Sequence, residues 1–215
     1  MKKISLMLSA VVMTSMLLSS CESNEESAST EVTIGTQVWM TKNLDVATFR
    51  NGDPIPEATT EGDWKAYASA EEAAWCYYDN DPKNGKKYGK LYNWYAVNDP
   101  RGLAPNGWHL PSEDEWTVLV DYLGGEEKAG AKLKSKIGWT EDGNGTNSSG
   151  FSGLPGGNRF VSGSFYGIGD YGYWWSATEF NTIFAYSRVL SRDSGDLKRV
   201  DASKARGLSV RCLRD

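Results

Sequence analysis

The chain has 215 residues, a formal net charge of −5 and 23 glycines, and 40% of its residues are hydrophobic. This length allows one domain with its own hydrophobic core, and the acidic balance argues against nucleic acid as a partner. Because the chain has only one histidine and three cysteines, we expect no catalytic residue, no metal site of nitrogen and sulfur ligands, and no other cofactor.

The first twenty residues predict a secretory signal peptide. Lys2 and Lys3 precede an apolar run that ends at Leu18, and this run is too short and too interrupted for a transmembrane helix. The sequence Leu-Ser-Ser-Cys at 18–21 is typical of a bacterial lipobox, which predicts that Cys21 is acylated and begins the mature protein. An ordinary signal peptide with a chance cysteine is the alternative.

Residues 21–31 predict a flexible tether, because this segment contains no large apolar side chain. The folded domain then spans residues 32–215. The cluster of Glu22, Glu25 and Glu26 resembles the acidic surface-export signals of Bacteroidetes lipoproteins. We therefore expect an outer-membrane lipoprotein, not a cytoplasmic protein, that contacts the membrane through its N-terminal lipid and faces either the periplasm or the cell exterior.

Short apolar runs alternate with polar turns in the first half of the predicted domain. Gly35-Thr36 lies between two alternating runs, which favours a two-residue hairpin over residues 32–39. The other predicted segments are a loop over 51–64, a helix over 69–74, a strand over 75–78, a polar turn over 79–89 and a helix or strand over 91–97.

The strongest signal of regular structure is a helix start near the middle of the chain. Ser112 and Glu115 have the spacing of a capping box, and an apolar stripe with helical period begins at Trp116. Two consecutive glycines favour the left-handed conformation that ends a helix, so we predict a helix over 113–123. A second, shorter helix is predicted over 126–136.

Glycine dominates the next part of the chain, with ten glycines in residues 143–172. This content excludes a helix and disfavours long strands, so we predict a large irregular loop region. Strands are predicted over 173–178 and 184–190. The alternation of apolar and polar residues over 208–212 predicts a half-buried strand near the C-terminus.

Two cysteines remain if Cys21 carries the lipid. Cys76 and Cys212 are then the only pair that can form an intramolecular disulfide in an oxidising compartment. The alternative is two buried free thiols, which are common in protein cores. Both possibilities stay open at this point.

Ordered motifs run through the whole predicted domain: Ile34–Met40, Asn51–Pro56, Trp75–Asn80, Tyr88–Trp94, Gly107–Trp116, Gly150–Gly157, Trp174–Thr178 and Ser209–Asp215. Over residues 32–215 the chain thus resembles the Fibrobacter succinogenes major paralogous domain family. The resemblance implies a lipoprotein domain and leaves its molecular role open. Many members carry Cys-Pro just before Gly-Trp-His, whereas this chain has Ala104-Pro105, which makes a Cys76–Cys212 bridge less secure.

The helix-start motif around Ser112 also resembles the signature of formylglycine-generating and related sulfatase-modifying enzymes. This resemblance implies an α+β, C-type lectin-like fold, with two helices packed on small antiparallel sheets and a long Gly-rich loop region. The enzymes need a pair of nearby cysteines near the C-terminus, and iron-dependent relatives need three histidines. Because this chain offers only Cys212 and His109, we do not expect an enzyme.

Aromatic residues around the glycine-rich loops are the candidate ligand-binding site. Such rings stack on sugar faces, and Arg159 and Asp170 would add hydrogen bonds. The alternative is that the rings form a minor core, and strand alternation predicts that Trp175 is buried while Trp174 faces outward. The candidate binding residues are Arg159, Phe165, Tyr166, Asp170, Tyr171, Tyr173 and Trp174.

Two polar clusters resemble calcium loops only in composition. Calcium needs six to eight oxygen ligands, and runs of Asp, Asn and Gly are usually plain turns. A structural calcium ion is therefore the minor alternative to two ordinary turns. The clusters are Asp79, Asp81 and Asn84, and Asp142, Asn144 and Asn147.

These observations predict a cell-envelope lipoprotein that acts by binding, without catalysis. The expected ligand is a glycan or another extracellular protein. A structural role in the envelope or an appendage, with no small ligand, is the first alternative. A degenerate sulfatase-modifying activity is the second.

Overall fold

The structure, a computed structural model, describes residues 30–215. The predicted signal peptide, the lipobox with Cys21 and all but the last residues of the predicted tether lie outside this range. Among the described residues, no helix has the length and apolar character needed to cross a membrane. The described chain combines helices with small sheets, so the α+β class is confirmed.

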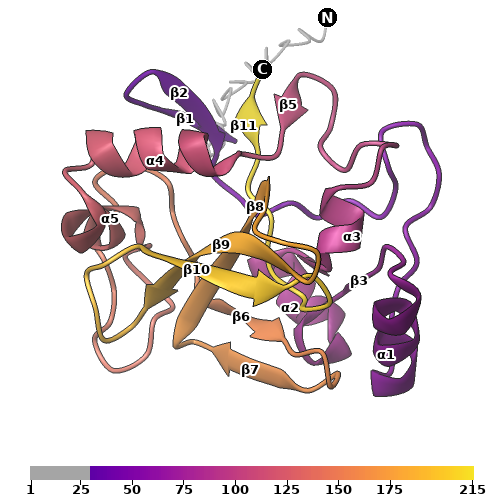
Figure 1. Ribbon diagram of the computed structural model, residues 1–215. Helices are drawn as coiled ribbons and strands as arrows, with labels where there is room; N and C mark the ends of the chain where they lie inside the picture. The colour runs from indigo at the N-terminus through magenta and orange to yellow at the C-terminus, as the bar shows by residue number, and fades with distance from the viewer. Residues whose placement is uncertain (1–29) are drawn as a thin grey trace, which may run out of the picture.

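The predicted N-terminal hairpin is confirmed and forms part of a four-stranded sheet. Strands β1 (Glu31–Ile34) and β2 (Gln37–Met40) pair through a tight turn in which Gly35 has a φ of 63°. The C-terminal strand β11 (Leu213–Arg214) lies between β2 and β5 (Trp108–His109), as Figure 1 shows. Both ends of the described chain therefore meet in one sheet.

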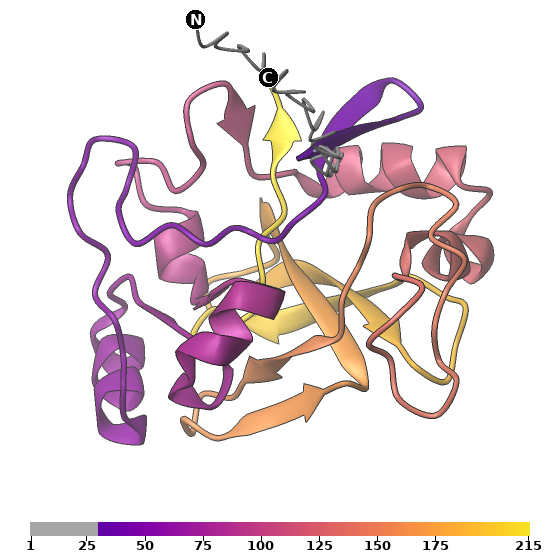
Figure 2. The same cartoon turned by 180° about the vertical axis from the view of Figure 1, so that it is seen from behind.

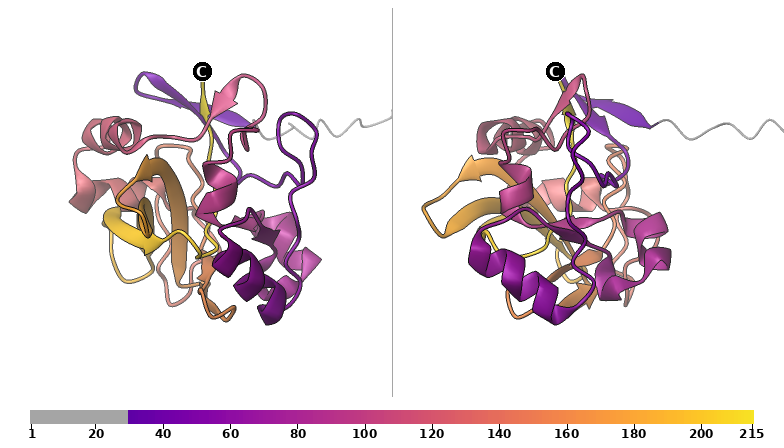
Figure 3. Two further views of the ribbon diagram at one scale, coloured as in Figure 1. Left: turned by 45° about the vertical axis from the view of Figure 1, so that its right-hand side comes forward. Right: turned by 90° about the vertical axis from the view of Figure 1, so that its right-hand side faces the viewer.

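The first half contains more helix than its sequence predicted. The predicted loop over 51–64 is confirmed up to residue 60, where the chain enters α1 (Glu61–Ala70). The predicted helix over 69–74 is wrong, because α1 ends at Ala70, and the predicted turn over 79–89 contains α2 (Pro82–Tyr88). Both views of Figure 3 place α1 and α2 at the end of the molecule away from the β1–β2 hairpin. The elements are α1 (Glu61–Ala70), β3 (Trp75–Cys76), a 3₁₀ turn η1 (Tyr78–Asn80), α2 (Pro82–Tyr88), β4 (Leu91–Tyr92) and α3 (Trp94–Val97).

The two helices predicted in the middle of the chain are confirmed as α4 (Glu113–Tyr122) and α5 (Glu126–Leu133). The side chain of Ser112 accepts from the backbone N–H of Glu115, and the Glu115 carboxylate accepts in return from the backbone N–H of Ser112. This reciprocal capping fixes where α4 begins.

A five-stranded sheet occupies the second half, in the order β10-β9-β8-β6-β7. Its pairs are antiparallel except for β6 and β8. The predicted loop over 143–172 is therefore only partly irregular, because it contains β6 and β7. The irregular part, between α5 and β6, runs beside the sheet on the side of α5, at the right of Figure 2. The strands are β6 (Gly156–Arg159), β7 (Phe165–Ile168), β8 (Tyr171–Glu179), β9 (Phe184–Ser191) and β10 (Lys198–Ser203).

Strand β8 is covered on both faces, which corrects the prediction for its two tryptophans. Trp174 belongs to a cluster that includes Trp116 of α4, and Trp175 belongs to a second cluster that includes Trp94 of α3. Alternation does send the rings to opposite faces, but each face has its own apolar cover. Both rings are therefore buried, with exposed fractions of 1% and 0%, and Trp174 does not face outward.

The segment over 208–212 is also buried on both sides, so the predicted half-buried strand is wrong. It runs between β4 and β8, through bridges from Leu208 to Tyr92 and from Ser209 to Trp174. All five of its residues are buried, including the polar Ser209 and Arg211. Its position between two other elements, rather than at an edge, explains this burial.

Of the two possibilities left open for the cysteines, the structure has two buried free thiols, and the candidate Cys76–Cys212 disulfide is not formed. Cys76 and Cys212 are both free and buried, and they belong to different apolar clusters. Burial raises the pKa of each thiol to about 12, although Arg159 lowers that of Cys76 and Arg211 lowers that of Cys212. The thiols therefore act as small apolar core groups.

Candidate functional site

Two of the predicted binding residues lie in the interior. Trp174 packs in the core as described above, and Arg159 has an exposed fraction of 0%. The Arg159 guanidinium donates to the backbone carbonyls of Ala58 and Thr60 at 2.8 Å each and of Gly163 at 3.0 Å. Arg159 therefore ties the start of α1 to β6, and neither residue lies on a ligand surface.

Three other predicted residues come together on the surface. The rings of Tyr166 and Tyr171 stack with centroids 5.7 Å apart, and those of Tyr171 and Tyr173 stack at 5.8 Å, both at interplanar angles of 28°. Phe160, which the sequence did not single out, extends the series with its ring 5.8 Å from that of Tyr166. We call Phe160, Tyr166, Tyr171 and Tyr173 the aromatic row.

Strand geometry explains why the aromatic row forms. Tyr171 and Tyr173 are two residues apart on β8, so their side chains lie on the same face of the sheet. Tyr166 of β7 reaches the row because β6 connects the two strands, with Gly157 paired to Gly172 and Asn158 paired to Tyr166. Two strands, β7 and β8, and the residue that follows β6 therefore contribute to one surface.

The aromatic row runs from the core to solvent. Tyr173 packs against the cluster that contains Trp175, and burial raises its pKa to about 12 despite the nearby positive charge of Arg206. At the other end, Tyr166 is 49% exposed and Phe160 is 36% exposed. One end of the row is thus held in place, while the other end is exposed to solvent.

Polar groups flank the aromatic row on one side. The guanidinium carbon of Arg206 lies 4.7 Å from the Phe160 ring centroid and 5.7 Å from that of Tyr173. Its Nη2 donates to Oδ1 of Asn158 at 2.8 Å, but its buried Nε has no acceptor among the described residues. Sequence reasoning gave no reason to select Arg206, because only the fold brings it to these rings.

The remaining two predicted residues have partners of their own. Asp170 accepts from Nη1 of Arg192 at 3.0 Å and from the hydroxyl of Thr140. The ring of Phe165 lies 5.1 Å from that of Tyr78 and packs against a third apolar cluster. Asp170 is therefore neutralised by an arginine, and Phe165 belongs to the packing beneath the surface.

The only histidine of the chain is engaged at both ring nitrogens. Nδ1 of His109 lies 2.8 Å from Oδ1 of Asp215, and Nε2 lies 2.8 Å from Oε1 of Glu115. Partial burial works to lower the pKa of His109, but the two carboxylates outweigh it and the pKa is raised. This arrangement joins the C-terminal end of the chain to the first turn of α4.

The calcium-like clusters serve as caps and turns. Oδ1 of Asp81 accepts from the backbone N–H of Lys83 and caps α2, and Asn147 pairs with Ser152. In residues 30–215, no group of three or more His, Cys, Asp or Glu side chains is arranged to hold a metal ion.

Comparison with known proteins supplies a family. A family model described as the Fibrobacter succinogenes major domain matches residues 32–214, which is nearly the whole described chain. The comparison with curated proteins found no match.

Proposed function

We propose that this chain, which belongs to the Fibrobacter succinogenes major domain family, is a non-catalytic binding module of the cell envelope whose ligand surface is the aromatic row. The observation that carries the proposal is the stacked set of rings, anchored in the core at Tyr173 and open to solvent at Tyr166. Because the rings are already held in position, little conformational entropy is lost when a ligand stacks on them.

The chemistry of the row fits a glycan. Flat aromatic faces pack against the apolar faces of sugar rings, while polar groups at the rim hydrogen-bond to sugar hydroxyls. The guanidinium of Arg206 lies beside Phe160 and Tyr173 and places a polar, cationic group next to the rings. A chain of sugars, rather than one small molecule, matches a series of four rings that come from β7, β8 and the residue after β6.

We extend the proposal to a C-type lectin-like fold. The pairing of β1–β2 with the C-terminal β11 and the packing of α4 and α5 beside the strands support this architecture. An experimental structure superposed on lectin-like domains tests it. A different strand order in the region over 156–203 would contradict it.

We also propose that the protein is an outer-membrane lipoprotein acylated at Cys21. The support is the basic start, the short apolar run and the Leu-Ser-Ser-Cys sequence at 18–21. Labelling cells with a fatty-acid analogue should mark the wild-type protein and not Cys21→Ala. Protease treatment of intact cells then separates the two orientations, because only a surface-exposed domain is digested.

The absence of catalysis is part of the proposal. It is supported by the hydrogen bonds of both His109 nitrogens to carboxylates, which leave neither nitrogen available to a substrate. An assay for formylglycine formation on a sulfatase-derived peptide tests this point. Turnover that disappears in His109→Gln would contradict it.

A protein partner is the second candidate, and a separate surface favours it. Phe180 and Ile183, at the turn between β8 and β9, are 50% and 61% exposed. Exposed apolar side chains of this size, gathered at one turn, are typical of interaction surfaces. This surface also suits the structural role in the envelope.

A glycan array probed with the full chain tests the proposal. We expect signals on a defined group of polysaccharides, and we expect free sugar of the same type to abolish them. Silence across a broad array would contradict glycan binding and favour the protein-partner or structural role.

A further inference from the structure

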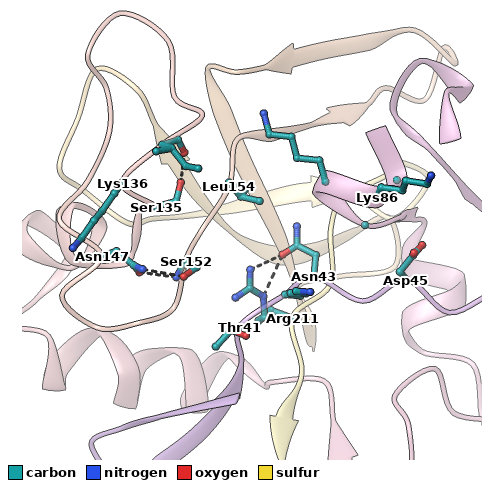
Figure 4. Close-up of a pocket in the computed structure, with 15 residues that line it drawn as sticks. Thr41, Asn43, Asp45, Lys86, Ser135, Lys136, Asn147, Ser152, Leu154 and Arg211 are labelled. Carbon is teal, nitrogen blue, oxygen red and sulfur yellow. Dashed lines mark hydrogen bonds between the residues drawn. The ribbon is translucent and has the colours of Figure 1, made fainter. Parts of the chain in front are cut away.

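A pocket of about 670 Å³ lies on a different part of the molecule from the aromatic row, and positive charge dominates its lining. Figure 4 shows Asn43 and Arg211 in its middle, with Lys136 and Lys86 on opposite sides. Two further lysines line it, and Asp45 is the acidic residue among the lining side chains. The charged lining residues are Lys42, Asp45, Lys86, Lys87, Lys136 and Arg211.

The positive charge of the pocket is not neutralised within the described residues. Asp45 is paired with Lys90, whose Nζ lies 2.5 Å from its carboxylate, so it does not offset the pocket lysines. None of Lys42, Lys86, Lys87 and Lys136 forms an ion pair in residues 30–215, whereas the whole chain is acidic with a net charge of −5. Such a local concentration of one sign of charge attracts ligands of the opposite sign.

Arg211 adds a buried positive charge to the pocket, because its side chain is charged and only 1% exposed. Its guanidinium donates to Oδ1 of Asn43, at 2.8 Å from Nη2, and to the backbone carbonyls of Met40 and Phe151. All of these acceptors are uncharged. Burial lowers the pKa of Arg211 to about 9, and a buried cation without an anion is costly to the fold.

We propose that this pocket binds a small organic polyanion, that is, a ligand with two or more carboxylate, sulfate or phosphate groups on one carbon framework. The lysines come from three separate segments: Lys42 follows β2, Lys86 and Lys87 belong to α2, and Lys136 follows α5. One anionic group therefore cannot reach all of them. The volume lies within the roughly 300–1,000 Å³ range of ligand pockets, and Ile137 and Leu154 provide apolar contacts for a carbon framework. The site stands independently of the aromatic row.

Calorimetric titration of the full chain tests the proposal with four probes: a sulfated disaccharide, an oligogalacturonate, a phosphorylated sugar and inorganic sulfate. The unsulfated disaccharide is the neutral control. We expect at least one organic polyanion to bind with an affinity that falls as salt rises, because surface charges are screened. The probe that binds best identifies the anionic group. Equal binding of inorganic sulfate, or no binding of any probe, would overturn the proposal.

Charge-matched variants show whether binding occurs in the pocket. Lys86→Gln with Lys136→Gln should weaken binding by about tenfold or more, since two cationic contacts are removed. Lys128→Gln with Lys198→Gln removes the same charge from exposed residues that do not line the pocket, and should leave the affinity unchanged. Equal losses in both double variants would show a general charge effect and contradict the site. Tyr166→Ala should not affect polyanion binding. The polyanion proposal and the glycan proposal can therefore be contradicted independently of each other.

Discussion

Tyr166 of β7 and Tyr171 of β8 stack with ring centroids 5.7 Å apart and planes inclined at 28°. The pair lies where the aromatic row passes from partly buried to exposed residues. Stacking at the surface keeps both rings in one orientation, which is what a preformed sugar-binding surface needs.

Replacement of Tyr171 separates stacking from hydrogen bonding. Tyr171→Phe retains the ring and should bind the glycan with unchanged affinity, whereas Tyr171→Ala should lose about 1 kcal/mol of binding free energy. Titration calorimetry with the glycan identified on the array measures both. Tyr122→Ala, at an exposed tyrosine on α4, is the control and should bind normally. A loss in Tyr171→Phe equal to that in Tyr171→Ala would argue for the hydroxyl instead.

Arg159 should contribute to stability and not to binding. Arg159→Met leaves the carbonyls of Ala58, Thr60 and Gly163 without their buried donor, and we expect about 2 kcal/mol or more of lost unfolding free energy. Urea denaturation measures the loss, with the exposed Arg199→Met as control. A stable variant that no longer binds glycan would instead assign Arg159 to the ligand site.

Phe151 should be one of the most sensitive core positions. Its ring lies within about 6 Å of the rings of Trp39, Trp116 and Trp174, and the Arg211 guanidinium carbon lies 4.2 Å from its centroid. Phe151→Ala should therefore cost about 3–5 kcal/mol in the free energy of unfolding. The exposed Phe180→Ala should stay within about 0.5 kcal/mol of wild type. Similar values for the two variants would contradict the assigned core.

His109 should make stability depend on pH. Because its folded pKa is raised above the ordinary value of about 6.5, its stabilising charge is fully present below that pH and is lost as pH rises through the folded pKa. The melting temperature of wild type relative to His109→Gln should thus fall as pH rises above about 6.5. If the melting temperatures of wild type and His109→Gln changed with pH in the same way, His109 would not be held as a cation.

The two core cysteines should be inert in the folded protein. Both thiols are buried with a pKa raised to about 12, so neither thiolate nor access is available to a maleimide. Mass spectrometry should find Cys76 and Cys212 unmodified in native protein and both modified after unfolding without reductant. An unfolded protein that reacts only after reduction would show that a bridge forms.

Local signals explain the elements that the sequence predicted correctly. The hairpin depends on Gly35 and its neighbours, and α4 depends on Ser112 and Glu115, which are three residues apart. The missed helices had comparable signals. Thr60 and Asp63 form a capping box at α1, and Asp81 caps α2 with Pro82 in its first turn. The polar composition around them concealed these helix starts.

The errors at the candidate site have a different origin, because they depend on tertiary packing. Nothing in the sequence near Trp174 shows that apolar clusters cover both faces of β8. Arg159 is of a residue type that often binds ligands, yet two of its acceptors, Ala58 and Thr60, lie about one hundred positions away in the chain. Arg206 and Phe160 join the aromatic row only through the fold, whereas Tyr166, Tyr171 and Tyr173 were already among the candidate binding residues predicted from the sequence.

The central claim, that the aromatic row binds the glycan, is tested most directly by comparing wild type with the double variant Tyr166→Ala and Tyr171→Ala. The measurement is the dissociation constant for the array-selected glycan, with circular dichroism to verify the fold. The account predicts an affinity weakened by about tenfold or more, with the polyanion pocket unaffected. An unchanged dissociation constant in a correctly folded double variant would contradict it.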